Sequence, residues 1–166
     1  MMTNGKREFT PGGGQRPGQG KKKKEVPPKV VEAAKNGVVN AVRVAIDKKF
    51  IESVEKFGEY FSASNSQVRN IFTAVKRMEI KFMAANEFDG QAFWMLRPRL
   101  FYAAQRPSGE DLKPLREVLS PAIDAVIEEQ DPTQRAERFS RFCRCCEAIV
   151  AYMPRKKDKE GGGDDE

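Results

Sequence analysis

Two short segments place arginine and lysine side chains beside an apolar helical stripe, in residues 67–77 and 96–106. The six cations are Arg69, Lys76, Arg77, Arg97, Arg99 and Arg106. Guanidinium and ammonium groups on rigid helices can contact the phosphates of a polyanion without reading the bases of a nucleic acid. Each of these cations could equally form an ordinary ion pair, so the sequence leaves both roles open for every one of them.

The net charge of the chain favours an acidic partner, but its distribution matters more than its total. The 166 residues carry 30 Lys+Arg and 24 Asp+Glu, which gives a formal charge of +6. Residues 1–47 hold 10 basic and 4 acidic side chains, whereas residues 48–153 hold 16 and 15. The central region is therefore nearly neutral, and it can bind nucleic acid only if its charges segregate onto separate faces.

Most catalytic and metal-binding sites lack their usual side chains in this sequence. The chain has no histidine, and its cysteines are Cys143, Cys145 and Cys146, within about one helical turn. A tetrahedral zinc site needs four convergent ligands, and no second cysteine pair supplies the others. We therefore expect no metal, no cofactor and no enzymatic activity. Cys143 and Cys146 are interpreted as small buried residues on the apolar side of a helix.

The ends of the chain differ in composition from its middle. Residues 1–28 are rich in glycine and proline and contain four lysines at positions 21–24, which predicts a disordered basic arm. Residues 154–166 are predicted to be a short disordered charged tail. The arm could attract phosphate or could only increase solubility. Residues 29–153 remain as one domain, and its odd number of cysteines together with the absence of an apolar leader or membrane span predicts a soluble cytoplasmic protein.

The apolar residues of the central region recur with the period of a helix. Phe50, Val54, Phe57 and Phe61 are one such stripe. Capping residues are predicted at Ser64, in a capping box, and at Ser108. We predict helices over about residues 30–46, 50–61, 64–82, 91–105, 108–127 and 132–153, with a turn at residues 86–90. The expected fold is all-α, a single compact bundle of five to six helices.

Five positions carry more specific expectations. Pro98 and Pro121 should interrupt the helices over residues 91–105 and 108–127, because proline removes a backbone donor. Phe101 is expected to fill the core, and Val150 is expected to face inward. Trp94 lies off the inward stripe of its helix and is the better candidate for contact with another subunit.

Several short motifs follow one another in a recognisable order along this helical region. They are Ser66-Gln67-Val68-Arg69 at a helix start, Lys76 on the same helix, Leu96-Arg97-Pro98-Arg99-Leu100, Tyr102-Ala103-Ala104-Gln105-Arg106, and Ala148-Ile149-Val150-Ala151-Tyr152. Together they resemble the small helical subunit of type III-A CRISPR effector complexes, the Csm small subunit. The resemblance covers about residues 48–153. The Gly/Lys-rich arm and the cysteine segment are not features expected of that family.

The resemblance implies a non-catalytic subunit that stacks in several copies along a ribonucleoprotein in antiviral defence. Its implied partners are guide RNA, target RNA and the other subunits of the Csm complex, namely backbone subunits, the large subunit and further copies of itself. The six cations named above are the RNA-binding candidates, because they lie in the motif segments. Two alternatives stay open, a nucleoid-type DNA-binding protein that uses the basic arm and a cytoplasmic helical adaptor.

Overall fold

The computed structural model describes residues 25–61, 65–106 and 112–154, and within these ranges it contains helices and no strand. The helices are α1 (Pro28–Arg43), α2 (Lys48–Tyr60), α3 (Asn65–Ala85), α4 (Gly90–Trp94), α5 (Leu96–Gln105), α6 (Lys113–Ile127) and α7 (Pro132–Tyr152). Helices α4 and α5 are the two halves of the helix predicted over residues 91–105. The predicted all-α bundle is confirmed. Most of the predicted arm, the tail beyond residue 154, Ser64 and Ser108 lie outside the described residues.

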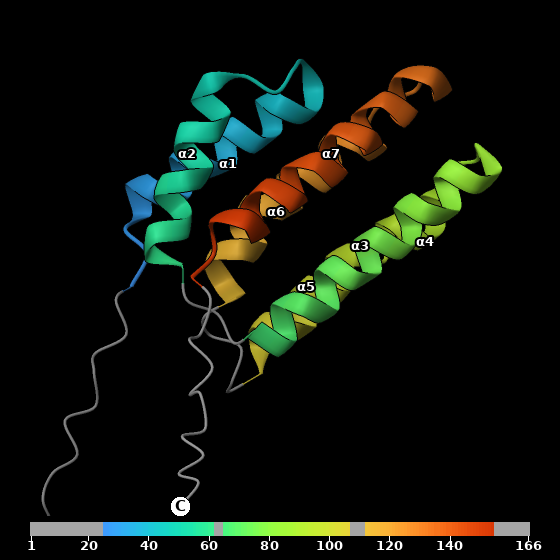
Figure 1. Cartoon of the computed structure of the whole chain (residues 1–166). Coiled ribbons are helices and arrows are strands. Elements are labelled where there is room, and N and C mark those ends of the chain that lie inside the picture. Colours follow the sequence, from blue (N-terminus) through green and yellow to red (C-terminus); the bar gives the residue numbers. More distant parts are fainter. Residues whose placement is uncertain (1–24, 62–64, 107–111, 155–166) are drawn as a thin grey trace, which may run out of the picture.

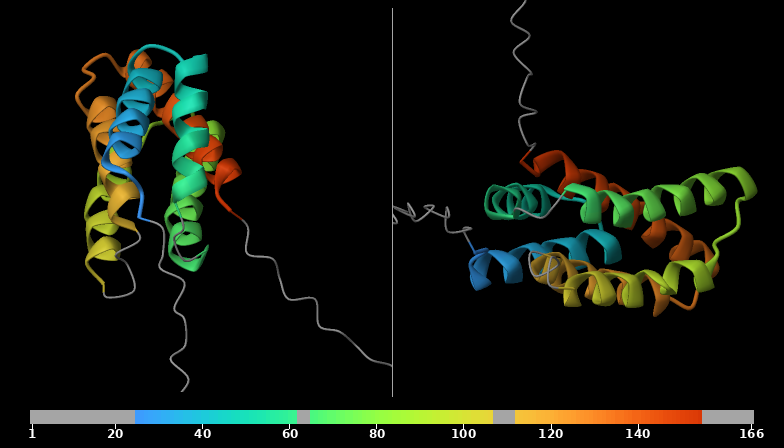
Figure 2. Two further views of the ribbon diagram at one scale, coloured as in Figure 1. Left: turned by 90° about the vertical axis from the view of Figure 1, so that its left-hand side faces the viewer. Right: turned by 90° about the horizontal axis from the view of Figure 1, so that it is seen from below.

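The helices form two layers (Figures 1 and 2). One layer contains α2, α7 and α3, with α7 in the middle, and the other contains α1, α6 and the α4–α5 pair, with α6 in the middle. Helix α7 also contacts α1 and α6 across the two layers. Helix α3 therefore lies at one edge of the bundle, next to α4 and α5, and α2 lies at the opposite edge of the same layer.

Phenylalanine rings join α3 and α4 to the central helix α7. The ring of Phe139 on α7 lies 5.4 Å from Phe82 on α3, 5.4 Å from Phe93 on α4 and 5.1 Å from Phe88 in the connecting loop. Phe93 also packs edge to face against Phe142, at 5.1 Å between ring centroids. Such edge-to-face and tilted contacts are favourable for aromatic rings and fix the relative positions of the helices that carry them.

The turn predicted at residues 86–90 joins α3 to α4. Asn86 has a φ of 51°, a left-handed conformation that asparagine adopts more readily than most residues, and its N–H donates to the carbonyl of Phe82 at 2.8 Å. The Asp89 carboxylate accepts a hydrogen bond of 2.9 Å from the Ala92 N–H, which caps the start of α4. The two caps turn the chain back, so that α4 and α5 run beside α3.

The two prolines behave differently. Pro98 lies in the first turn of α5, where its missing N–H costs no helical hydrogen bond, and the helix breaks just before it at Met95 as predicted. Pro121 lies inside α6, which continues from Lys113 to Ile127, so the predicted interruption is wrong. Leu119 and Ile123 on either side of Pro121 are fully buried, and their packing holds the helix together across the lost hydrogen bond.

Two predictions about the core are also wrong. Phe101 is 51% exposed, because it faces outward on α5 and has the Arg116 guanidinium 5.3 Å above its ring. Val150 is 45% exposed, because the last turn of α7 packs against α2 through Tyr152, which lies on the other side of the helix from Val150. The predicted core residues Phe50, Val54, Phe57 and Phe61 are all buried.

Gly58 lies where α2 crosses the end of α7. A Cβ at this position would lie 2.5 Å from the Tyr152 carbonyl oxygen and 2.8 Å from its Cβ. Gly58→Ala is therefore expected to lower the free energy of unfolding by about 1–3 kcal/mol, the usual cost of overpacking, although alanine is the better helix former. Thermal unfolding of the two proteins measures this difference.

Gly37→Ala is the matched control for the Gly58 variant. Gly37 also lies inside a helix, but its added Cβ would meet the tip of a side chain, the Ser53 hydroxyl, which can rotate away by giving up its 2.8 Å hydrogen bond to the Phe50 carbonyl. We expect the Gly37 variant to change stability by less than about 1 kcal/mol. Equal destabilisation by both substitutions would contradict the proposed close crossing of α2 and α7.

The cysteines confirm the interpretation of small buried residues, and Cys145 is buried with the other two. Burial raises the pKa of the Cys143 and Cys145 thiols to about 12, and that of Cys146 is raised as well. Since the thiolate is the reactive form, we expect the folded protein at pH 8 to react with Ellman's reagent at least about 100-fold more slowly than the unfolded chain. Rapid labelling of one thiol in the folded protein would contradict this burial.

Candidate functional site

A groove runs along the edge of the bundle between α3 on one side and α4 and α5 on the other. It consists of two adjoining cavities, and Ala74 and Arg99 line both of them. The α3–α4 cavity has a volume of about 240 Å³, and the α3–α5 cavity has a volume of about 290 Å³. We call the two cavities together the basic groove.

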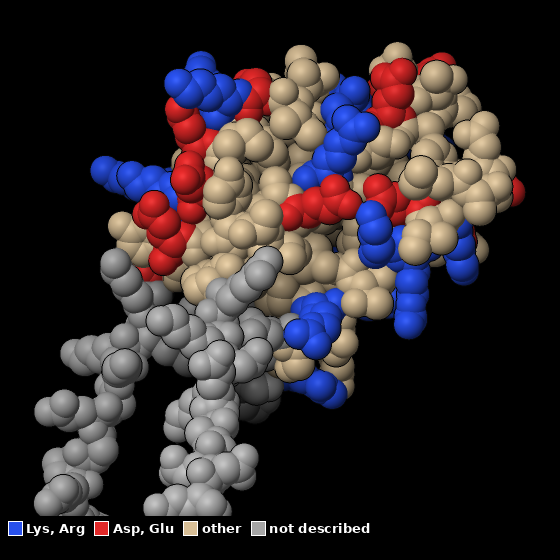
Figure 3. Space-filling view, viewed as in Figure 1, with Lys and Arg blue, Asp and Glu red and all other residues tan. Residues whose placement is uncertain are grey.

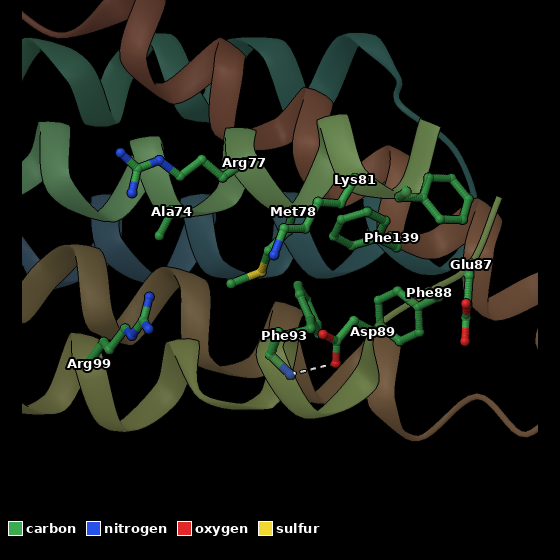
Figure 4. A pocket seen from close by; sticks show the side chains of 12 residues that line it. Ala74, Arg77, Met78, Lys81, Glu87, Phe88, Asp89, Phe93, Arg99 and Phe139 are labelled. Carbon is green, nitrogen blue, oxygen red and sulfur yellow. Dashed lines mark hydrogen bonds between the residues drawn. The ribbon is translucent and has the colours of Figure 1, made fainter. Parts of the chain in front are cut away.

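Four cations line the basic groove. Arg77 and Lys81 project from α3, and Arg99 and Arg106 project from α5. Arg77 and Lys81 are one helical turn apart and so lie on the same side of α3. Figure 4 shows both of them across from Arg99, with Met78, Phe93 and Phe139 in the hollow between. The floor of the groove is thus apolar, both of its rims carry cations, and Glu87 and Asp89 add two carboxylates at the end near α4.

The cations on the rims keep most of their hydrogen-bonding capacity free. In the described part of the chain, Arg77, Lys81 and Arg99 are exposed and form no ion pair. Arg106 stacks on Tyr102, with its guanidinium carbon 4.9 Å from the ring centroid, and donates a 3.2 Å hydrogen bond to the phenol oxygen. Unpaired guanidinium groups that face one groove from two helices can together bind several oxygens of an anionic chain.

Two of the six predicted site residues lie elsewhere and are paired. Arg97 binds Asp124 of α6 at 2.8 Å. Lys76 bridges Glu79 at 2.6 Å and Glu147 of α7 at 2.9 Å. The hydrogen bonds that Lys76 donates to Glu79 and then to Glu147 raise its pKa above the ordinary value, so it stays charged. These two cations join neighbouring helices, whereas Arg77, Arg99 and Arg106 come together in the basic groove.

Arg69, the sixth predicted site residue, lies outside the basic groove, whereas two residues that were not predicted line it. Arg69 is exposed near the start of α3, forms no ion pair with the described residues, and does not line the basic groove. Lys81 and Asn70 were not predicted, although both line the groove. Lys81 follows Arg77 by four residues, and this helical spacing is a signal that could have identified it.

Three arginines of α7, Arg135, Arg138 and Arg141, have partners within the fold. Arg138 pairs with Glu129 at 2.6 Å, and Arg141 donates a 2.8 Å hydrogen bond to the Val42 carbonyl. Arg135 donates a 2.7 Å hydrogen bond to the Glu129 carbonyl. These side chains fasten α7 to α1 and to the end of α6, so they are occupied by contacts within the fold.

Basic and acidic side chains are interspersed over the face of the molecule that Figure 3 shows. Several basic side chains lie toward the lower right of the view with acidic side chains beside them, and the column of acidic side chains over α2 on the left has basic side chains above and beside it. The exposed acids of α2 are Glu52, Glu55 and Glu59. The lysines Lys48, Lys49 and Lys56 are exposed on α2 as well, so charge segregates only locally, in the cluster of cations that lines the basic groove.

The described residues contain neither a membrane-spanning helix nor a cluster of metal ligands. No helix among them is long and apolar enough to cross a bilayer. Nowhere in these same ranges do three or more histidine, cysteine, aspartate or glutamate side chains gather in a way that could hold a metal ion.

Comparison with known proteins identifies one family. The model of a family described as Csm2 Type III-A matches residues 46–158, which include α2 to α7 and therefore both sides of the basic groove. No curated protein and no solved structure gives a significant match. Helix α1, which packs against α2, α6 and α7, precedes the matched residues.

Proposed function

Since the chain belongs to the Csm2 Type III-A family and is thus a small subunit of the type III-A Csm complex, we propose that it binds the sugar-phosphate backbone of guide or target RNA in its basic groove. The observation that carries this proposal is the set of unpaired cations, Arg77, Lys81 and Arg99, that face the groove from two helices. Contacts to phosphate oxygens carry no sequence information. Such contacts suit a subunit that must accept any guide and any target.

The role proposed here is positioning, without catalysis. The described side chains around the groove supply charge, hydrogen-bond donors and an apolar floor, and helices α3 and α5 hold them in fixed places. Membership of a family of structural small subunits supports this role. The proposal assigns cleavage of nucleic acid to other subunits of the complex.

An exposed apolar face on α4 and α5 supports contact with a neighbouring subunit. Trp94, Met95 and Phe101 are each more than half exposed on this short stretch. Contiguous apolar surface that is rimmed by polar groups is typical of protein–protein interfaces, where tryptophan and tyrosine are enriched. We propose that a backbone subunit, the large subunit or a further copy of this protein covers this face in the assembled complex.

Binding of fluorescein-labelled RNA to the full chain, followed by anisotropy, tests the proposed RNA contact. Two single strands of equal length and unrelated sequence should have dissociation constants within about threefold of each other, and both should rise steeply with salt as counterions are released. A variant without residues 1–24, which leaves the buried Val26 in place, should retain most of the affinity. Absence of binding at low salt, or strong preference for one sequence, would contradict the proposal.

The same variant distinguishes the proposal from the nucleoid-type alternative. That alternative predicts that removal of the lysines at 21–24 abolishes binding to duplex DNA and to RNA alike, because the arm would supply the contacts. If binding disappears with the arm, the basic groove is not the site.

A further inference from the structure

The α3–α5 cavity differs from the rest of the basic groove in the side chains that line it. Its floor and walls contain the apolar side chains of Ile71, Ala74, Leu96 and Ala103. Ile71 and Leu96 belong to the buried core, so the floor of the cavity is fixed by packing. The volume of about 290 Å³ is close to the lower limit of ~300 Å³ for small-molecule pockets. A planar heterocycle is an appropriate size for such a space.

Polar groups surround this apolar floor on both sides. Asn70 presents an exposed amide from α3, and Arg99 and Arg106 present guanidinium groups from α5. Tyr102 adds an aromatic ring beside Arg106. None of the described residues that line the α3–α5 cavity is acidic, whereas Glu87 and Asp89 line the α3–α4 cavity next to it.

This combination matches the chemistry of a nucleotide. A base has flat faces that pack on apolar or aromatic groups, and its edges carry the donors and acceptors that amide side chains pair with. Its phosphates are anions, which guanidinium groups bind in a bidentate manner. An acidic peptide would use the arginines but would not match the chemistry of the Asn70 amide and the apolar floor.

We propose that the α3–α5 cavity receives one base of a bound RNA strand, turned out of the stack, while the flanking phosphates contact Arg99 and Arg106. This inference rests on the proposed function, since it places a base in the groove whose rims are proposed to bind the backbone. The Asn70 amide can both donate and accept hydrogen bonds, so the cavity admits any of the four bases. Base insertion therefore adds affinity without adding sequence preference.

The first test compares two ligands of the same charge on the full, unmodified protein. One is a single-stranded RNA, and the other is an abasic chain of equal length with the same ribose-phosphate backbone. Stacking of a single base on a protein is worth ~1–3 kcal/mol, so the abasic chain should bind about 5-fold to 150-fold more weakly. RNA with 2-aminopurine at an internal position should also change its fluorescence on binding, because the base leaves the stack.

The second test fills the cavity. Ala103→Leu adds apolar volume to the cavity wall without changing charge, and it should bring the affinity for RNA down to that for the abasic chain. Ala33→Leu, at an exposed position on α1, is the matched control and should leave the difference between the two ligands intact. Circular dichroism and thermal unfolding establish that the Ala103 variant is folded, and the comparison on the unmodified protein needs no variant.

The outcomes separate the two proposals. Equal binding of RNA and abasic chain would overturn the base pocket and leave backbone binding in place. Failure of both ligands to bind at low salt would overturn the proposed function and the base pocket together. Displacement of RNA by a short polyglutamate peptide at similar affinity would instead identify the cavity as a site for an acidic protein segment, and would overturn the base pocket.

Discussion

Replacing Phe139 with alanine should lower the free energy of unfolding by about 3–5 kcal/mol, as found for truncation of buried aromatic side chains. Phe139 is 1% exposed, and its ring contacts Phe82 of α3, Phe88 of the loop and Phe93 of α4. The substitution removes the ring on α7 that packs against all three of these phenylalanines. It leaves a void beneath the α3–α4 cavity. Denaturation with urea, followed by circular dichroism, measures the loss.

Phe101→Ala is the matched control for this prediction. It makes the same chemical change at a position that is 51% exposed, so we expect a loss below about 1 kcal/mol. Phe139→Leu, which keeps most of the apolar volume, should fall between the two. Similar losses for the Phe139 and Phe101 alanine variants would show that Phe139 does not hold the groove helices in place.

Helical spacing was enough to predict the elements and much of the core. Phe50, Val54, Phe57 and Phe61 follow the period of one helix face, and all four are buried in the structure. Which side of a helix meets a neighbour is decided by tertiary packing, which is why Phe101 and Val150 were misplaced. Pro121 was misjudged for a related reason, since the packing of the residues around it outweighs its local effect on the helix.

The candidate site was predictable only in part. The period of α3 separates Arg77 from Lys76, but it does not show which flank faces α5 and which faces α7. Lys76 forms an ion pair with Glu147, which lies 71 residues later in the chain. Arg97 forms an ion pair with Asp124, which lies 27 residues later. Contacts at such separations follow from the arrangement of the helices in two layers. Lys81 could have been predicted from the sequence, because it follows Arg77 by one helical turn and therefore lies on the same face of α3.

Pairing within the fold divides the cations of this protein by role. Lys76, Arg97, Arg138 and Arg141 each bind a carboxylate or a carbonyl of another helix and so contribute to the assembly of the bundle. Arg77, Lys81 and Arg99 remain without such partners among the described residues. An anion that enters the basic groove therefore meets cations that need not break an internal ion pair in order to bind it.

The double variant Arg77→Glu, Arg99→Glu should weaken binding of single-stranded RNA by at least roughly 30-fold at moderate salt, because two phosphate contacts are lost and two repulsive charges are gained. Both side chains line the α3–α4 cavity from opposite rims and are free of ion pairs in the described ranges. The plot of log affinity against log salt should become shallower by about 1.4 or more, since each contact to a single strand contributes about 0.7 to the slope. Anisotropy at several salt concentrations measures both quantities.

Lys49→Glu, Lys56→Glu is the control of equal charge. Both lysines are exposed on α2, which packs against α1 and α7 at the opposite edge of its layer from α3, so this variant changes net charge by the same amount without touching the basic groove. We expect it to weaken binding by less than about threefold, through the long-range field alone, which salt screens. If both double variants lose affinity equally, RNA responds to the total charge of the protein, and Arg77 and Arg99 do not form a site. A large loss confined to the groove variant means that two helices hold these cations where the phosphates of one strand can reach both.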